Sequence, residues 1–157
     1  MPKQRSQIRM STEEVFALLE ECRSLQVATL NRDGSPHLTT LWFAVVDGAI
    51  VFETFSKSQK IVNLKRDPRI AVLVEAGASY GELRGVSINA KAELVEGPER
   101  VQGLAFHVMK RHNPGVSEEQ LRVLARQLAR KRTGVVVRPE KVVSWDHRKL
   151  GAVSGPL

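Results

Sequence analysis

Residues 54–60, which read Thr-Phe-Ser-Lys-Ser-Gln-Lys, bring hydroxyl and ammonium groups together in one short segment. The segment follows a predicted β-hairpin and opens a predicted helix, and a helix start offers free N–H groups and the positive end of a dipole. Ser56 and Ser58 add hydroxyl donors, and Lys57 and Lys60 add charge, so together these groups could hold a phosphate. Ordinary helix capping by Ser56 or Ser58, with the lysines in solvent, also explains the same residues. The spacing alone leaves both interpretations open.

The sequence does not contain a comparable group of residues for a catalytic nucleophile or for a metal site. Cys22 falls on the apolar face of a predicted helix, beside Leu18 and Leu19, which indicates a structural cysteine. His107 and His112 are five residues apart, about 140° around a helix, and therefore do not share a face. The sequence has no Walker loop or G-x-G-x-x-G turn. Its one G-x-S-x-G match, residues 77–81, lies in a predicted loop between two strands, whereas a nucleophile elbow needs a turn from strand to helix. We therefore assign no catalytic side chain and no metal ligand.

Four helices are expected around these residues. Ser11 and Glu14 form a capping-box pattern before apolar residues at helical spacing, which predicts a helix over residues 12–23. A short helix is predicted over 56–65, ended by Asp67-Pro68. Two longer helices are predicted, one beginning at Pro98 and one capped by Ser117.

The strands set the fold class. Asp47-Gly48 joins two β-rich runs, and this is a strong hairpin signal. The alternation from Val86 to Leu94 predicts an antiparallel strand with one wet face. The predicted strands are residues 25–30, 36–46, 49–54, 69–75, 86–94 and a last pair at 135–137 and 142–145. Sequential antiparallel strands with late helices predict a mainly β fold with peripheral helices (α+β), a small antiparallel barrel.

Composition fits one cytoplasmic domain over residues 1–157, with flexible tails at 1–10 and 151–157. A single cysteine excludes an internal disulfide, and no apolar run is long enough for a signal peptide or a membrane span. The formal net charge of +7 raises nucleic-acid binding as an alternative. Arg122, Arg126 and Arg130 instead recur as on a solvated helix face, and no aromatic residue accompanies them for base stacking. We therefore expect neither nucleic-acid nor membrane partners.

Several short motifs together resemble the pyridoxamine-phosphate-oxidase-like split β-barrel proteins, whose fold is FMN-binding-like. These motifs are Ser58-Gln59-Lys60, Asn63-Leu64 and Asp67-Pro68-Arg69, the first hairpin at residues 27–37, and the later strand at 85–96. The resemblance covers most of residues 12–96 and, weakly, 133–150.

The resemblance implies a homodimer with a cofactor groove between the protomers. Lys60 matches the family's phosphate-binding lysine and Ser58 its hydroxyl neighbour, within a basic segment that also includes Ser56 and Lys57. Thr54 matches a position beside the ring or ribityl chain. Thr39 and Thr40 match a strand whose backbone runs along the ring. Trp42 and Trp145 suit either a wall of the ring pocket or core packing.

Departures from the family pattern argue against the oxidation of pyridoxamine phosphate as the function of this chain. Enzymes that oxidise pyridoxamine phosphate carry arginine where Gln59 stands, and their C-terminal Arg-x-His-Asp-Arg signature is absent. The pattern is more similar to the branch that uses the deazaflavin F420. We therefore expect an F420-dependent oxidoreductase that transfers a hydride between cofactor and a small-molecule substrate. The alternatives are an FMN-dependent oxidoreductase of the same fold and a non-catalytic flavin-, deazaflavin- or heme-binding protein.

Overall fold

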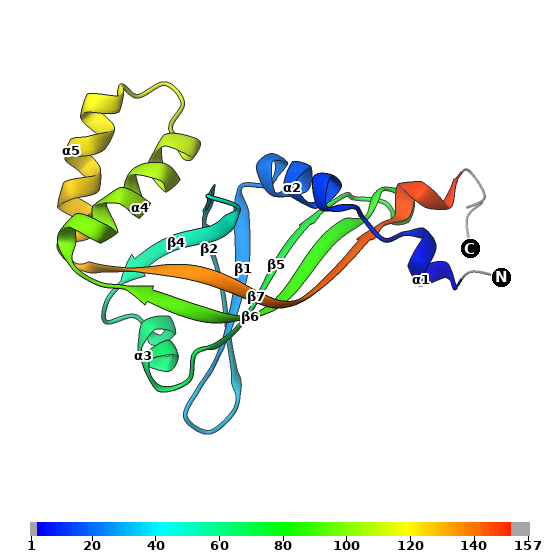
Figure 1. The fold of residues 1–157 in the computed structure, drawn as a ribbon, viewed down its shortest axis with the longest axis horizontal. Coiled ribbons are helices and arrows are strands. Elements are labelled where there is room, and N and C mark those ends of the chain that lie inside the picture. Colours follow the sequence, from blue (N-terminus) through cyan, green and yellow to red (C-terminus); the bar gives the residue numbers. More distant parts are fainter. Residues whose placement is uncertain (1–2, 152–157) are drawn as a thin grey trace.

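A seven-stranded antiparallel sheet forms the body of the protein in a computed structural model that describes residues 3–151 (Figure 1). The strand order is β2-β1-β5-β6-β7-β4-β3. The strands are β1 (Ser24–Leu30), β2 (Pro36–Trp42), β3 (Ala44–Val46), β4 (Ala49–Phe55), β5 (Arg69–Ala76), β6 (Arg84–Val95) and β7 (Arg132–Asp146). The helices are α1 (Gln4–Gln7), α2 (Thr12–Glu21), α3 (Gln59–Arg66), α4 (Pro98–His112) and α5 (Glu118–Ala129), with 3₁₀ turns η1 (Tyr80–Glu82) and η2 (His147–Leu150).

The two edges of the sheet are brought together by one residue. β2 and β3 lie at opposite edges, yet only Phe43 separates them in sequence. Because consecutive Cα atoms are about 3.8 Å apart, the sheet must curl until its edges approach each other. Phe43 is completely buried at this junction. The curled antiparallel sheet confirms the predicted split barrel, and it divides the extended run of residues 36–46 into two strands.

The interior of the curl is the main hydrophobic core. Leu25 and Val27 of β1, like Phe52 of β4, are fully buried there. Helix α2 contributes Leu18 and Leu19, and its start has the predicted capping box, in which Ser11 and Glu14 each bond the other's backbone N–H. The Asp47-Gly48 hairpin is also confirmed, because both residues have positive φ, 49° and 76°.

Helices α4 and α5 pack side by side at the opposite end of the sheet from α1 (Figure 1). Val108 of α4 joins Ala44 and Val51 in a second apolar cluster on the outer face of β3 and β4. The two helices are inserted between β6 and β7, as the sequence pattern predicts. Arg122, Arg126 and Arg130 are exposed, in agreement with a solvated helix face.

The predicted last pair of strands is wrong, because β7 is one continuous strand from Arg132 to Asp146. Pro139 interrupts the sequence pattern, but the β6–β7 register shifts between Asn89 and Ala90, and this bulge accommodates it. A proline lacks the N–H that a regular ladder needs and is tolerated at such an irregularity. Strand β7 therefore continues through Pro139, where the sequence pattern predicted a break between two strands.

The N-terminal segment also differs from the flexible tail predicted for residues 1–10. Residues 4–7 form α1, and Met10 is buried in the core. The backbone of Ile8 accepts a hydrogen bond from the Asp146 N–H at 2.7 Å, so this segment lies along the end of β7. Most of the predicted C-terminal tail, residues 152–157, lies outside the described residues.

Candidate functional site

The start of α3 offers backbone donors, as the predicted phosphate site requires. Ser58 is the N-cap, and its hydroxyl accepts the Ile61 N–H at 3.5 Å. The N–H groups of Gln59 and Lys60 have no backbone acceptor among the described residues. The helix dipole adds a partial positive charge at the same place. Helix α3 starts later than predicted, at Gln59, because Ser58 takes the capping role that the sequence left open between two serines.

Lys60 stands in the first turn of α3 with its side chain half-buried. It has no ion pair with a carboxylate in the described part of the chain. Burial alone lowers the pKa of the Lys60 ammonium below its ordinary value. A partly desolvated cation without a counter-ion is favourably placed to receive an anion. Lys57, by contrast, is exposed in the turn before the helix.

Beneath this turn the structure brings three hydroxyl side chains together. Thr54 is buried and lies opposite Thr133 in the β4–β7 register. The hydroxyls of Ser56 and Thr133 are 2.8 Å apart, within hydrogen-bond distance. The Ser56 N–H donates to the Lys131 carbonyl at 3.0 Å. Ser56 therefore ties the turn to the first residues of β7.

Arg132 is a neighbour of this site that the sequence pattern did not single out. It pairs with Phe55 in the β4–β7 register, and its guanidinium lies 4.5 Å from the centre of the Phe55 ring. It also forms an ion pair of 2.7 Å with Glu53, whose side chain is only 7% exposed. Its Nε is buried without a hydrogen-bond partner in the described residues. Strand pairing, which sequence spacing does not reveal, places this cation beside the turn.

Thr39 and Thr40 occupy edge strand β2, where alternate residues face opposite sides. Thr40 lies opposite Gln26, and Thr39 lies opposite the buried Val27. The two threonine side chains therefore cannot both face one ligand. Among the described strands, only β1 pairs with β2, so the other edge of β2 has backbone groups without a strand partner there. Contact between the backbone and a ring requires such an edge.

The two tryptophans have different surroundings. Trp42, at the end of β2, is 53% exposed and stacks on His112 with ring centroids 4.5 Å apart and planes 1° apart. Trp145 instead packs on Gly85, where a Cβ atom would lie only 2.1 Å from its ring. Trp145 therefore has the packing role, whereas Trp42 keeps one face of its ring open.

Within residues 3–151, no group of three or more His, Cys, Asp or Glu side chains is arranged to hold a metal ion. Over the same residues, no helix is both long and apolar enough to cross a bilayer.

Comparisons with known proteins identify the family to which this fold belongs. The family model for pyridoxamine 5'-phosphate oxidase matches residues 11–146. The conserved hypothetical protein Rv2991 from Mycobacterium tuberculosis is 42% identical, with a TM-score of 0.90, over 99% of this chain and 96% of its own. No curated protein matches the chain.

Two further solved structures share the fold at lower identity. An F420 reductase is 24% identical, with a TM-score of 0.64, over 80% of this chain and 93% of its own. A FAD-binding protein from Mesorhizobium loti is 18% identical, with a TM-score of 0.63, over 86% of this chain and 92% of its own. With the family model matched from the first capped helix to the end of β7, the chain belongs to the pyridoxamine 5'-phosphate oxidase family of split β-barrel proteins.

Proposed function

We propose that this protein is an oxidoreductase that binds the deazaflavin F420 through a phosphate site at the start of α3. The observation that carries the proposal is Lys60, a half-buried cation without an acidic partner in the described residues, beside two free N–H groups. These groups fit a phosphate, because it would supply the acceptors and the negative charge that they lack.

The residues of this chain would bind and orient the cofactor. Lys60 and the first N–H groups of α3 would hold the phosphate, and the free edge of β2 would lie along the ring. When bound, F420 supplies hydride transfer, so no acid–base side chain is required. A small-molecule substrate would meet the ring near the open face of Trp42.

F420 is favoured over FMN by two features. Gln59 stands where the enzymes that oxidise pyridoxamine phosphate carry arginine, and an F420 reductase is among the proteins that share this fold. FMN remains the second candidate, because a FAD-binding protein also shares the fold and the start of α3 presents the same groups to either phosphate.

The test is a titration of wild type, Lys60→Ala and Lys57→Ala with F420, FMN and heme at two salt concentrations, followed by fluorescence quenching and absorbance. A lost charge-assisted hydrogen bond contributes roughly 1.5–3 kcal/mol, so Lys60→Ala should weaken binding about ten- to a hundredfold. Lys57→Ala is the matched control and should change affinity less, because its side chain is exposed. Turnover of reduced cofactor with added acceptors then separates an enzyme from a carrier. Equal affinity of Lys60→Ala and wild type for both F420 and FMN would contradict the site.

A further inference from the structure

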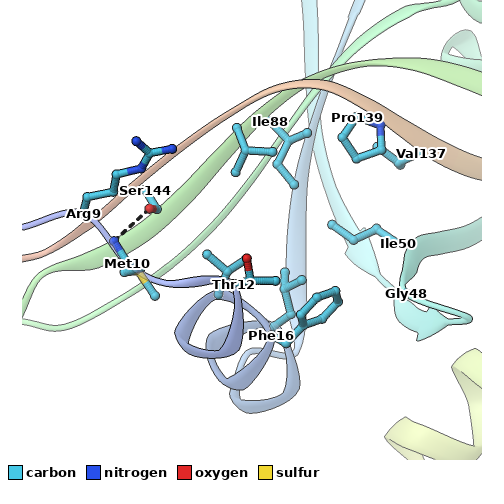
Figure 2. A pocket seen from close by; sticks show the side chains of 13 residues that line it. Arg9, Met10, Thr12, Phe16, Gly48, Ile50, Ile88, Val137, Pro139 and Ser144 are labelled. Atoms are coloured by element: carbon cyan, nitrogen blue, oxygen red, sulfur yellow. Dashed lines mark hydrogen bonds between the residues drawn. The ribbon is translucent and has the colours of Figure 1, made fainter. Parts of the chain in front are cut away.

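A second candidate ligand site lies away from α3. A partly open cavity of about 300 Å³ lies between α2, the β3–β4 hairpin and the second half of β7 (Figure 2). Its wall is mainly apolar and includes Phe16, Leu19, Ile50, Ile88, Val137 and Val142. It shares no residue with the segment Thr54–Lys60. This volume lies at the lower end of the range for small-molecule pockets, roughly 300–1,000 Å³.

Strand pairing explains why the space exists. β4 pairs with β7 only over Arg132–Val136, whereas β7 continues to Asp146. Pairing stops at Val136 because β4 begins at Ala49, just after the hairpin turn, so the rest of β7 lacks this neighbour. Pro139 has no N–H with which to pair with another strand. Helix α2 covers the resulting gap on one side without filling it (Figure 2). The cavity is therefore a consequence of the split in the barrel rather than of one small side chain.

One end of the cavity is polar. Arg9, Thr12 and Ser144 line it there, and the Ser144 hydroxyl accepts the Met10 N–H at 3.1 Å (Figure 2). Because a hydroxyl both accepts and donates, the Ser144 proton remains available to a ligand.

Basic side chains lie near the polar end of the cavity. An adjoining groove is lined by Lys3, Arg5 and Arg9. No carboxylate forms an ion pair with Arg5 or Arg9 in residues 3–151, and nearby Glu14 is already paired with Lys149 at 2.7 Å. The site thus combines an apolar wall with a cationic end that has no counter-ion.

We propose that this cavity binds a small molecule with an apolar body and a single carboxylate, whose head group lies between Arg9 and Ser144. Charge complementarity selects the anionic head, and the apolar wall selects the body. This proposal is independent of the cofactor site, since the two share no side chain.

The test uses the full-length protein with decanoate as the probe, measured by calorimetry and by displacement of the dye anilinonaphthalene sulfonate. Wild type should bind decanoate more tightly than octanoate by about fifteenfold, because decanoate has two more methylenes and each buried methylene contributes about fourfold. Arg9→Glu should weaken decanoate binding about tenfold or more and leave binding of uncharged decanol unchanged. Arg126→Glu, the same charge change at an exposed position of α5, is the matched control and should have no effect.

A filling variant tests the location. Val142 lines the cavity and is 46% exposed, so Val142→Trp can fill the space without rebuilding the core. It should abolish decanoate binding while circular dichroism and F420 titration remain as in wild type. Absence of decanoate binding to wild type, as expected if a second copy of the chain fills the cavity, would overturn the proposal. So would equal binding of decanoate by Arg9→Glu and wild type, or unchanged binding by Val142→Trp.

Discussion

At the residue scale, the charge state of Lys60 makes the phosphate site dependent on pH. Burial lowers the pKa of Lys60 in the free protein, and a bound phosphate would raise it again by favouring the ammonium. Binding therefore takes up a proton between these two pKa values, and affinity should fall as pH rises through that window.

Titration of F420 from neutral pH to beyond the ordinary pKa of lysine tests this expectation. Lys60→Arg is the control, because a guanidinium stays protonated throughout and should give a flatter profile. A wild-type affinity that is constant over the whole range would show that Lys60 does not contact the anion.

Cys22 provides a second prediction at this scale. It lies just past the end of α2, half-buried against the core, with its Sγ 3.5 Å from the Glu75 carbonyl. Burial is the largest cause of the raised pKa of its thiol, which leaves little thiolate at neutral pH. Cys22→Ala should cost roughly 1 kcal/mol in the free energy of unfolding and leave cofactor affinity unchanged. Chemical denaturation and F420 titration measure the two quantities, and loss of turnover in a folded variant would contradict a structural role.

At the element scale, Arg111 joins three segments that are distant in sequence. From the end of α4 it donates to the carbonyls of Leu19, Glu20 and Cys22 at the end of α2, and to that of Phe43 between β2 and β3. Its guanidinium also lies 4.4 Å from the centre of the Phe43 ring. A cation at a helix C-terminus satisfies carbonyls that the helix leaves free and interacts favourably with its dipole.

Arg111→Ala should therefore lower the free energy of unfolding by on the order of 3 kcal/mol, since several charge-assisted hydrogen bonds are lost together. Urea denaturation measures the effect. Arg126→Ala removes an exposed arginine from the neighbouring helix and should change stability by less than about 0.5 kcal/mol. Equal effects of the two substitutions would mean that the Arg111 contacts contribute nothing to holding α4 against α2.

At the scale of the whole molecule, the outer face of β1 and β2 supports the proposed homodimer. Leu38 and Trp42 are 68% and 53% exposed there. A shallow groove of about 350 Å³ includes Ala28, the partner of Leu38 in the β1–β2 register, together with Leu30 and Ala71. Exposed apolar surface of this kind is typical of an interaction site.

Sedimentation should give twice the 17.5 kDa of one chain at micromolar concentration. Leu38→Lys should shift the equilibrium towards monomer, because it places charge on that face. Leu124→Lys, at a 41% exposed leucine of α5, is the matched control and should leave the dimer intact. A monomeric wild type would contradict the cofactor groove between two protomers that the family resemblance implies.

Local sequence signals determined most of the elements of this protein. The capping box at Ser11 and the Asp47-Gly48 hairpin are interactions between residues close in sequence, so they are readable without the fold. The same holds for the alternation in β6 and for a serine cap at the start of α3, a role that Ser56 and Ser58 could each have filled. The boundary of α3 and the continuity of β7 were less readable, because a competing serine and a proline each offered a local stop.

Only the tertiary structure decided which residues distant in sequence contact one another. Strand pairing between β4 and β7 brings Thr133 and Arg132 to the turn that carries Ser56, although about half the chain separates them in sequence. The burial of Lys60 without a counter-ion and the gap between β4 and the end of β7 likewise depend on how the sheet curls. Residue spacing carries no information on such contacts, since they arise between segments whose separation in sequence is unrelated to their distance in the fold.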